Sequence, residues 1–325
     1  TIKGEEDSML ENCNIPILNK EKINHYETEY MIDKLGGEGR MYCIDVYNGV
    51  QIIYNRFHCY EAPKTVIDNN STKYIEINHC LRGKFECLYD QEYYAYLTEG
   101  DLSISRWSLE KSNEFFTFGY YEGLEVLIDI EKAQNNEIFS EFNIDINLIS
   151  KKLTLNNDIY IMRATQQIQH IFMEMYNVDN DMKVDYLKIK VLELLLFLSH
   201  TDFEIIQDKK RYYPKNQIET VKSIKNYLSQ NLGIKPDFNK LAQEYNININ
   251  TLRKLFKEIY GVPIYTWFKQ YRIEYSIELL KSTDIPIIEI ANKIGYSNPS
   301  KYSAAFSKYV NMTPQQYRKS DIKMD

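Results

Sequence analysis

The alternation of apolar and polar positions divides the chain into three parts, and the first part has the pattern of β-strands. Between about residues 41 and 130, short β-branched or aromatic runs are separated by turn-forming residues. The runs are Val50–Tyr54, Tyr74–Ile77, Lys84–Tyr89 and Glu92–Leu97. Segments 81–84 and 89–92 are short enough to be hairpin turns, and Glu99-Gly100-Asp101 ends a further strand. Many short strands at roughly even spacing predict a β-sandwich or a small barrel.

The second part, from Asp158 to His200, has a helical period. One helical face is formed by Ile161, Ile168, Phe172, Met175 and Tyr176. A later set steps by four, three and four residues, the spacing of a heptad seam: Leu187, Val191, Leu194 and Leu198. Two heptads are too few to establish a coiled coil. A helix in a dimer interface and a helix packed on the barrel therefore both remain open.

The third part follows a charged segment with a proline, Asp208–Lys215, that is typical of a linker. A helical stripe then ends at Gly233 and Pro236. Its apolar residues are Ile218, Val221, Ile224, Leu228 and Leu232. After the stripe one unit occurs twice, as Leu241–Phe256 and Ile290–Phe306, and the second copy is one residue longer.

Each copy has the pattern of a helix-turn-helix. A small residue, Ala242 or Ala291, lets two helices approach closely, and four residues later Asn246 or Gly295 tolerates a left-handed backbone. A second helix with an apolar inner face follows. Between the copies we expect one long helix that holds the two units at a fixed separation. One of its faces carries Ile264, Trp267, Phe268, Tyr271, Tyr275 and Leu279.

Residues Asn216 to Lys319 resemble the DNA-binding domain of the AraC/XylS family of bacterial transcription regulators. The matching residues are Leu241-Ala242, Leu252, Phe256-Lys257, Gly261, Tyr271-Arg272, Leu279-Leu280, Ile287, Glu289-Ile290-Ala291, Gly295-Tyr296, Phe306-Ser307-Lys308, Thr313-Pro314 and Tyr317-Arg318. The resemblance implies that both units bind double-stranded DNA. Their recognition helices would enter successive major-groove turns, ~34 Å apart. Trp267 and Tyr271, at helical spacing, fit the core of the domain better than a stacking surface.

The resemblance also assigns the residues that face the DNA. The first recognition helix would start near Asn248, and the second would start near Asn298. The positions that would contact the DNA are Asn248, Asn250, Thr251, Arg253 and Lys254 in the first unit, and Asn298, Ser300, Lys301 and Ser303 in the second. Arg253 fits guanine and Asn250 fits adenine, although a merely solvated helix face is the alternative. Many relatives carry arginine where this chain has Ala304, so the second helix is expected to contribute more through phosphate and shape contacts.

The strand region resembles the jelly-roll, cupin-like sensing domain that is common ahead of this DNA-binding domain. The resemblance rests on the segment from Tyr74 to Gly83 and on the Glu99–Leu102 step. In relatives such a barrel binds a small effector, and the helices after it dimerise. The implied fold is a multidomain α+β protein whose second domain is all-α. Its predicted parts are a β-barrel sensing domain (1–157), a helical dimerisation segment (158–207), a linker (208–217) and a double helix-turn-helix domain (218–319, with units at about 238–259 and 286–309).

A cupin-like barrel also raises the question of a metal or an enzyme. His58 and His79 lie in the strand region, but the His-x-His pair of a cupin metal site is absent, and the next histidines, His170 and His200, follow in the helical region. No catalytic constellation stands out, so we predict no metal, no cofactor and no enzymatic activity. The cluster Gly36–Gly39 lacks the strand and helix context of a phosphate loop and predicts a turn. The aromatic residues at 93–96 and 115–121 fit an effector pocket or a barrel core equally, so no pocket residue is predicted.

Charge is distributed unevenly along the chain. The net charge of the 325 residues is −7. Residues 216–325 hold 16 Lys+Arg against 10 Asp+Glu, a balance of +6, which leaves 23 against 36, or −13, for residues 1–215. A basic C-terminal third attached to an acidic remainder is typical of a domain that binds a polyanion. The alternative is that the charged residues are merely distributed unevenly along the chain. The five cysteines are an odd number, and neither a signal segment nor an apolar run of ~18 residues is present, so we expect reduced thiols and a cytoplasmic location.

These patterns predict a DNA-binding transcriptional regulator controlled by a small effector in the N-terminal barrel. The expected partners are promoter DNA, a second copy of the chain, an unidentified effector and, if the protein activates transcription, RNA polymerase. Two alternatives remain open: an architectural DNA-binding protein, and a cupin-type enzyme fused to a DNA-binding domain.

Overall fold

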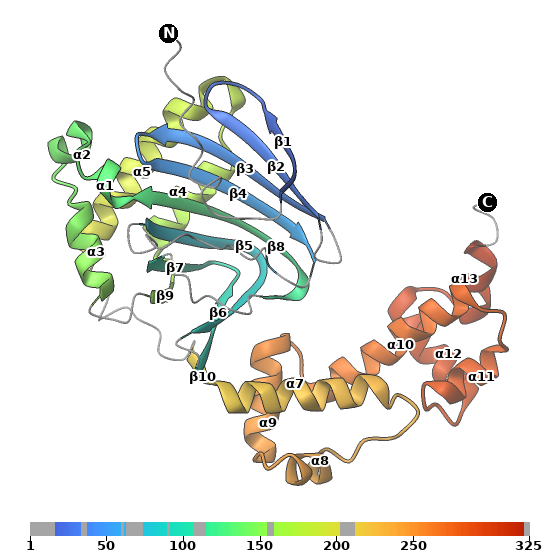
Figure 1. Cartoon of the computed structure of the whole chain (residues 1–325). Helices are drawn as coiled ribbons and strands as arrows, with labels where there is room; N and C mark the ends of the chain where they lie inside the picture. The colour runs from blue at the N-terminus through green and yellow to red at the C-terminus, as the bar shows by residue number, and fades with distance from the viewer. Residues whose placement is uncertain are drawn as a thin grey trace. The chain divides into compact units, whose positions relative to one another are not determined.

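The chain folds into two compact units, Thr1–Lys215 and Asn216–Asp325 (Figure 1). The computed structural model describes residues 17–33, 38–59, 62, 74–89, 92–106, 115–154, 159–201 and 212–321. The boundary between the units falls inside the predicted linker, of which residues 208–211 lie outside the described ranges, as do Cys13 and Gly36-Gly37. Every helix in those ranges is too short or too polar to cross a membrane.

The first unit is built on one antiparallel sheet that curls around an apolar interior (Figure 1). Its strands are β1 (Ile17–Lys22), β2 (Glu27–Asp33), β3 (Glu38–Tyr47), β4 (Val50–His58), β5 (Tyr74–Tyr89), β6 (Tyr93–Thr98), β7 (Asp101–Arg106), β8 (Phe115–Asp129), β9 (Ile159–Arg163) and β10 (Tyr212–Pro214). The order is β1-β2-β3-β4-β8-β5-β6-β10, and β7 and β9 extend the sheet from the first half of β5. With the helical second unit, this sheet confirms the predicted α+β class.

The predicted hairpin at residues 81–84 is wrong, because β5 is one continuous strand. Gly83 has a φ of 92°, and the register between β5 and β8 shifts on both sides of it. A Cβ atom at Gly83 would lie 2.4 Å from the carbonyl oxygen of Tyr120, so a side chain does not fit there. Bulges of this kind bend a strand without ending it. The bend lets β5 pair with β7 in its first half and with β6 in its second half, while β8 follows its other edge.

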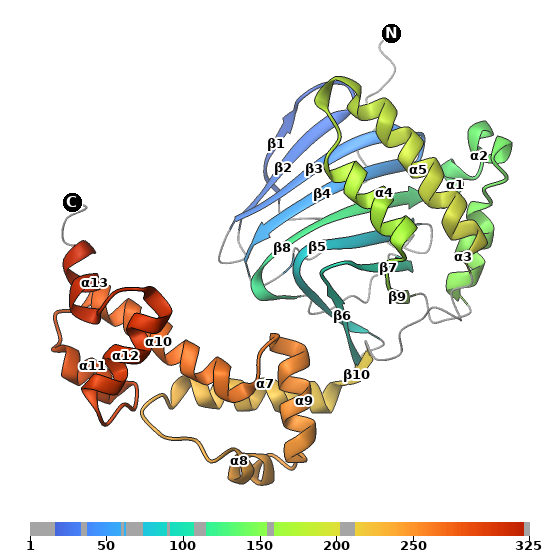
Figure 2. The same ribbon diagram turned by 180° about the vertical axis from the view of Figure 1, so that it is seen from behind.

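Five helices pack on the outer face of the curled sheet, and Figure 2 shows α4 and α5 lying across it. They are α1 (Ile130–Ala133), α2 (Glu137–Glu141), α3 (Ile146–Thr154), α4 (Gln166–Tyr176) and α5 (Lys183–His200). Side chains along β4 alternate between the two faces of the sheet. Ile52 belongs to the core between the sheet and the helices, and Ile53 belongs to the core inside the curled sheet. The predicted helical position of Ile161 is wrong, because this residue lies in β9 and pairs with Ser103 of β7.

The predicted heptad seam lies on α5 and is buried within its own chain. Leu187, Val191, Leu194 and Leu198 are all 0% exposed and belong to the core between the helices and the sheet. Of the two interpretations left open, the structure therefore favours a helix packed on the barrel. The opposite side of α5 exposes Ile189 (60%) and Phe197 (39%).

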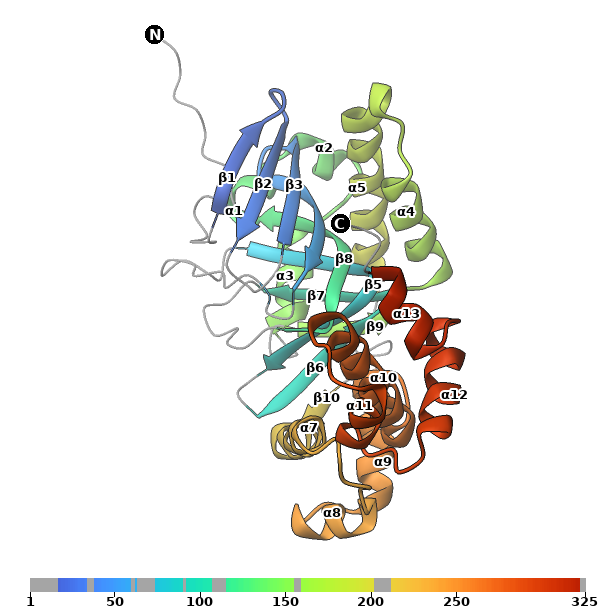
Figure 3. The same ribbon diagram turned by 90° about the vertical axis from the view of Figure 1, so that its right-hand side faces the viewer.

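The second unit is all-helical (Figure 3). Its helices are α7 (Lys215–Gln230), α8 (Phe238–Glu244), α9 (Ile249–Tyr260), α10 (Ile264–Ser282), α11 (Ile287–Lys293), α12 (Pro299–Val310) and α13 (Pro314–Asp321). Helix α9 packs on α10, and so do α11, α12 and α13. The helix pairs α8–α9 and α11–α12 fall where the sequence predicts the two helix-turn-helix units.

The residues predicted to share one face of the long helix α10 are not buried alike. Its first half buries Ile264 and Phe268, whereas its second half buries Ile273 and Leu280. Tyr275, which belongs to the predicted face, is 39% exposed. Ile273 and Leu280 join the apolar core of the second helix-turn-helix unit. The buried face therefore rotates along the helix, because the two units lie against different sides of it.

Candidate nucleic-acid interface

The first helix-turn-helix unit is shaped by two side-chain caps and one left-handed residue. The Asp237 carboxylate accepts hydrogen bonds from the backbone N–H groups of Asn239 and Lys240, which starts α8. Ala242 is 2% exposed, as expected for a close approach of two helices. Asn246 has a φ of 51° and turns the chain, as predicted.

Asn248 is the N-cap of α9. Its Oδ1 atom accepts hydrogen bonds from the backbone N–H groups of Asn250 at 2.8 Å and of Thr251 at 3.4 Å. The recognition helix therefore begins at the predicted residue. Because its side-chain oxygen is already engaged, the direct role that the structure gives Asn248 is to orient α9.

The second unit repeats the buried alanine, the left-handed turn residue and the asparagine cap of the second helix, with one extra residue in its turn; its first helix, α11, begins after Pro286 without a side-chain cap. Ala291 is 0% exposed and Gly295 has a φ of 74°. Asn298 caps α12 by accepting hydrogen bonds from the N–H groups of Ser300 at 2.8 Å and Lys301 at 3.3 Å. Residues 294–298 separate α11 from α12, whereas residues 245–248 separate α8 from α9, so the additional residue lies in the turn.

The predicted contact residues lie on the exposed sides of the two recognition helices. On α9, Asn250, Arg253 and Lys254 are exposed and Thr251 is half-buried, while the opposite side is buried through Leu252, Leu255 and Phe256. On α12, Ser300 and Lys301 are exposed and Ser303 is half-buried, while Tyr302 and Phe306 are 0% exposed. Ala304 is exposed, so the position where relatives carry arginine faces outward but offers no polar group.

Two basic residues that the sequence analysis did not assign to this surface extend it along the same helices. Lys257 follows Arg253 by four residues, and Lys308 follows Ala304 by four. Both side chains are exposed. The i, i+4 spacing is the sequence signal that identifies them.

The aromatic residues of α10 form the support behind α9. Trp267 stacks on Tyr271 with 5.1 Å between ring centroids and contacts Phe256 at 5.5 Å. The ammonium group of Lys225 lies 5.2 Å from the ring centroid of Tyr260 and 5.8 Å from that of Trp267, and burial lowers the pKa of this lysine. Trp267 and Tyr271 thus belong to the packed interior of the unit, as the sequence predicts.

In the first unit, polar side chains gather on the otherwise apolar inner face of the sheet. The Tyr121 hydroxyl donates to Asn78 Oδ1 at 2.6 Å, and Asn78 Nδ2 donates to Glu125 Oε1 at 3.2 Å. Burial raises the pKa of Tyr121 well above its ordinary value. Asn55 lies on the neighbouring strand opposite Gly123. It is 5% exposed, and its Oδ1 atom is buried without a hydrogen-bond partner. Of these residues only Tyr121 lies among the aromatic positions that the sequence marks for a pocket or a core; Asn55, Asn78 and Glu125 carry no local signal, because their strands meet only in the folded sheet.

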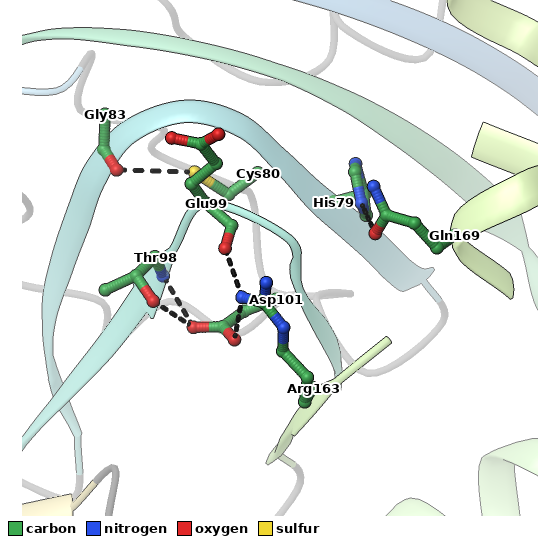
Figure 4. A network of polar contacts seen from close by, with 8 residues as sticks. All are labelled: His79, Cys80, Gly83, Thr98, Glu99, Asp101, Arg163 and Gln169. Atoms are coloured by element: carbon green, nitrogen blue, oxygen red, sulfur yellow. Dashed lines mark hydrogen bonds and ion pairs between the residues drawn. The ribbon is translucent and has the colours of Figure 1, made fainter. Parts of the chain in front are cut away.

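The turn at Glu99-Gly100-Asp101 joins β6 to β7, as predicted, and Figure 4 shows the contacts that hold it. The buried Asp101 carboxylate accepts a hydrogen bond from the backbone N–H of Thr98 at 2.8 Å and pairs with the Arg163 guanidinium at 3.4 Å. Arg163 also donates to the carbonyl oxygen of Glu99. These contacts hold the turn against β9. They give the Glu99–Leu102 segment a structural role.

The four histidines considered as metal ligands lie apart. His79 is 0% exposed, stacks on Phe172 at 4.5 Å between ring centroids, and places Nε2 3.0 Å from Gln169 Oε1 (Figure 4). His58 ends β4, His170 pairs with Glu174, and His200 contacts the Leu196 carbonyl oxygen. Among the described residues, no group of three or more His, Cys, Asp or Glu side chains is arranged to hold a metal ion.

Comparison with known proteins matches the second unit. A family model described as a helix-turn-helix domain covers residues 241–320. The virulence regulon transcriptional activator VirF of Yersinia enterocolitica is 27% identical over 135 residues, 42% of this chain and 49% of that protein. The melibiose operon regulatory protein of Escherichia coli is 32% identical over 100 residues, 29% of this chain and 33% of that protein. The chain thus spans half or less of the length of these relatives.

Among solved structures, the C-terminal domain of AraT, a response regulator from Geobacillus stearothermophilus, is 28% identical, with a TM-score of 0.30, over 31% of this chain and 84% of that one. The family model at residues 241–320 covers the two helix pairs, α8–α9 from Leu241 onward and α11–α12 in full, and the sequence relatives are AraC/XylS-type regulators. The second unit is a helix-turn-helix domain of the AraC/XylS family.

Proposed function

We propose that this protein is a transcriptional regulator that binds promoter DNA through both recognition helices. The observation that carries the proposal is the repeated helix pair, α8–α9 and α11–α12, in which an asparagine caps the second helix and the pair packs on the single helix α10. Each pair exposes polar and basic side chains on the outer side of its second helix. Helices presented in this way fit successive major grooves. VirF is a transcriptional activator and the melibiose protein is an operon regulator, and both similarities support the same function.

Selection of DNA sequences from a random duplex pool by the full chain tests this proposal. We expect enrichment of a site with two conserved blocks whose centres lie about one helical turn apart, 10–10.5 base pairs. The double variant Arg253→Ala/Lys301→Ala serves as the control and should lose the enrichment. Uniform recovery of all sequences by the wild type would instead support an architectural DNA-binding protein.

We further propose that the inner face of the sheet binds a small effector and that the protein catalyses no reaction. Buried polar groups are almost always hydrogen-bonded in folded proteins, and Asn55 Oδ1 is not. Together with the Tyr121–Asn78–Glu125 chain, it offers a ligand several polar contacts within an apolar surface, as small-molecule sites do.

A thermal-shift screen of one metabolite library against wild type and Asn55→Leu tests the effector site. A compound that stabilises the wild type but not the variant supports it, whereas equal stabilisation of both proteins argues against Asn55. Consumption of a stabilising compound by the wild type, followed by chromatography, would favour the alternative of a cupin-type enzyme.

We also propose that the protein forms a dimer, that it contacts RNA polymerase if it activates transcription, and that it is located in the cytoplasm. Because the predicted seam is buried, we propose that any dimer contact through α5 uses its outer side, around Ile189 and Phe197. Apolar side chains exposed at this spacing on one helix face are suited to contact a second copy of the chain.

A further inference from the structure

Besides its packing on α10, the second helix-turn-helix unit contacts the loop that connects α7 to the first helix-turn-helix unit. The loop after α7 contains Leu232 and Gly233, and the turn of the second unit contains Gly295. A Cβ atom on Gly295 would lie 2.8 Å from the carbonyl oxygens of both Leu232 and Gly233. A Cβ atom on Gly233 would lie 3.4 Å from the carbonyl oxygen of Lys293. The loop and the turn are therefore in backbone contact, and at Gly295 this contact leaves no room for a side chain.

Arg272, in the middle of α10, fills the space beside this contact. A Cβ atom on Gly295 would fall 1.7 Å from Arg272 Nη2, so the guanidinium occupies the position that a side chain would take. The guanidinium carbon lies 5.0 Å from the ring centroid of Phe268 and 5.2 Å from that of Tyr296. Tyr296 belongs to the turn of the second unit, whereas Phe268 lies one helical turn before Arg272 on α10. The guanidinium thus joins the linking helix to the second unit through two aromatic faces.

Burial of the Arg272 guanidinium costs folding free energy, so stability does not explain why an arginine lies at this position. The residue is 9% exposed, and its Nε and Nη2 atoms are buried without hydrogen-bond partners. An apolar side chain of similar volume commonly stabilises a core at least as well as a buried charge. The loop that the guanidinium faces follows the C-terminal end of α7, where backbone carbonyl groups carry partial negative charge. A fixed positive charge between this loop and the Gly295 turn therefore favours one relative position of the two units.

We propose that Arg272 is a positioning residue that fixes the rotation of the second recognition helix relative to the first, and so makes DNA binding depend on the spacing between the two base-pair blocks. This inference rests on the proposed function, because it assumes that both helices read DNA. A planar guanidinium stacks between two rings, whereas the ammonium of lysine is a point charge and does not. Arg272→Lys is therefore expected to behave like a loss of the contact.

The test uses the full chain and the DNA site selected by the wild type, with one base pair inserted or deleted between the two blocks. One base pair shifts a block by ~3.4 Å along the helix axis and turns it by about a tenth of a turn. Wild type should lose affinity by at least about tenfold on either altered site, as for a lost base contact. Arg272→Met and Arg272→Lys should bind the original site more weakly and lose less than about threefold on altering the spacing.

Lys269→Met is the matched control, because Lys269 is a basic and exposed residue of the same helix. Its spacing profile should match the wild type. If Arg272→Met does not fold, Tyr296→Leu removes one of the two rings and should weaken the spacing preference in the same direction. Unchanged spacing preference in folded Arg272→Met, or in Tyr296→Leu when that variant stands in for it, would overturn the proposal.

A measurement without DNA separates this inference from the proposed function. Spin labels carried by unnatural amino acids at the exposed positions Lys257 and Lys308 report the distance between the two recognition helices. We expect a narrow distance distribution in the wild type and a broader one in Arg272→Met. Equal distributions would overturn the inference even where DNA selection succeeds. If the wild type selects no DNA site but the distance distribution broadens in Arg272→Met, the result contradicts the proposed function and not the positioning role.

Discussion

Arg253 is the single arginine of α9 and α12, both described over their whole length, and the two recognition helices therefore differ in what they can read. The guanidinium fork of arginine can bind guanine through two hydrogen bonds, whereas lysine acts as a point charge on phosphate or base. In α12 the outward position Ala304 has no polar group, and Lys301 is the exposed basic residue of the first turn.

We expect Arg253→Ala to cost about 1–3 kcal/mol of binding free energy on the selected site and to relax the preference at one or two base positions. Lys301→Ala should weaken binding to all sequences by a similar factor and lower the salt slope by about one. Titration of both variants on the selected site and on scrambled DNA at two salt concentrations measures the difference. Loss of sequence preference in Lys301→Ala, with uniform weakening in Arg253→Ala, would mean that the roles are reversed.

His79 gives the first unit a stability that depends on pH. Burial lowers its pKa, against the hydrogen bond with Gln169 and the charge of Asp101, which raise it; the charge of Arg163 acts with burial. The folded state therefore holds the neutral ring while the unfolded state takes up a proton near pH 6.5. The stabilisation is present above that pH and is lost as the pH falls below it toward the folded pKa.

Urea unfolding of wild type and His79→Gln between pH 7.5 and 5.5 tests this linkage. The free energy of unfolding of the wild type should fall faster with decreasing pH, by up to about 1.4 kcal/mol per pH unit relative to the variant. His58→Gln, at the exposed end of β4, is the control and should follow the wild type. Parallel pH curves for wild type and His79→Gln would show that the histidine is not held neutral.

At the scale of single elements, the helices of the second unit could be predicted because their signals are local. Caps such as Asn248 and Asn298 and the left-handed Asn246 and Gly295 lie within a few residues of the helix ends they determine. The long strand β5 could not be predicted. Gly83 resembles a turn residue in sequence, and only the close passage of the Tyr120 backbone makes it a bulge.

The same limit explains the errors in the first unit and the missing part of the candidate site. Ile161 was assigned to a helix because its spacing to Ile168 fits a helical period, yet pairing with β7 makes it a strand residue. Asn55, Asn78 and Glu125 come from three strands and meet only through the register of β4, β8 and β5. No local pattern marks such a cluster.

The burial of the heptad residues of α5 leads to a prediction that distinguishes its two sides. Leu194→Asp should destabilise the first unit by about 4 kcal/mol or more, because it places an unpaired carboxylate in the core. Ile189→Asp, on the exposed side, should change the free energy of unfolding by less than about 0.5 kcal/mol. Urea unfolding measures both values.

Sedimentation of the same two variants tests the proposed dimer contact. Ile189→Asp should shift the chain toward monomers while leaving it folded. A folded monomer in Leu194→Asp would instead restore the heptad side as the interface. A folded dimer in Ile189→Asp would exclude the outer side of α5 around that residue.

At the scale of the whole molecule, the change in charge coincides with the boundary between the units. Residues 1–215 carry −13 and residues 216–325 carry +6, and the chain divides between residues 215 and 216. The first unit should therefore repel DNA while the second attracts it. The basic balance and the acidic balance thus each belong to one folded unit.

We expect the isolated unit 216–325 to bind duplex DNA with an affinity that falls steeply with salt. If the four exposed lysines Lys254, Lys257, Lys301 and Lys308 each neutralise one phosphate, the slope of log K against log salt concentration is about −3.6. The isolated unit 1–215 should not bind. Fluorescence anisotropy from 50 to 300 mM salt, roughly the range over which such binding is lost, measures the slope. A slope near zero for 216–325 would be incompatible with the assigned surface.

The shared helix α10 also limits how this domain can change in length during evolution. Adding one residue inside an α-helix advances everything after it by ~1.5 Å and rotates it by about 100°. An insertion within α10 would therefore turn α12 away from the side of the DNA that α9 faces, and an insertion after Arg272 would also change the position of Arg272 relative to Gly295. The turns between paired helices carry no such penalty, and the longer turn at residues 294–298, compared with 245–248, shows one extra residue accommodated there. Length variation in this architecture should therefore collect in the turns, while α10 keeps its count of residues.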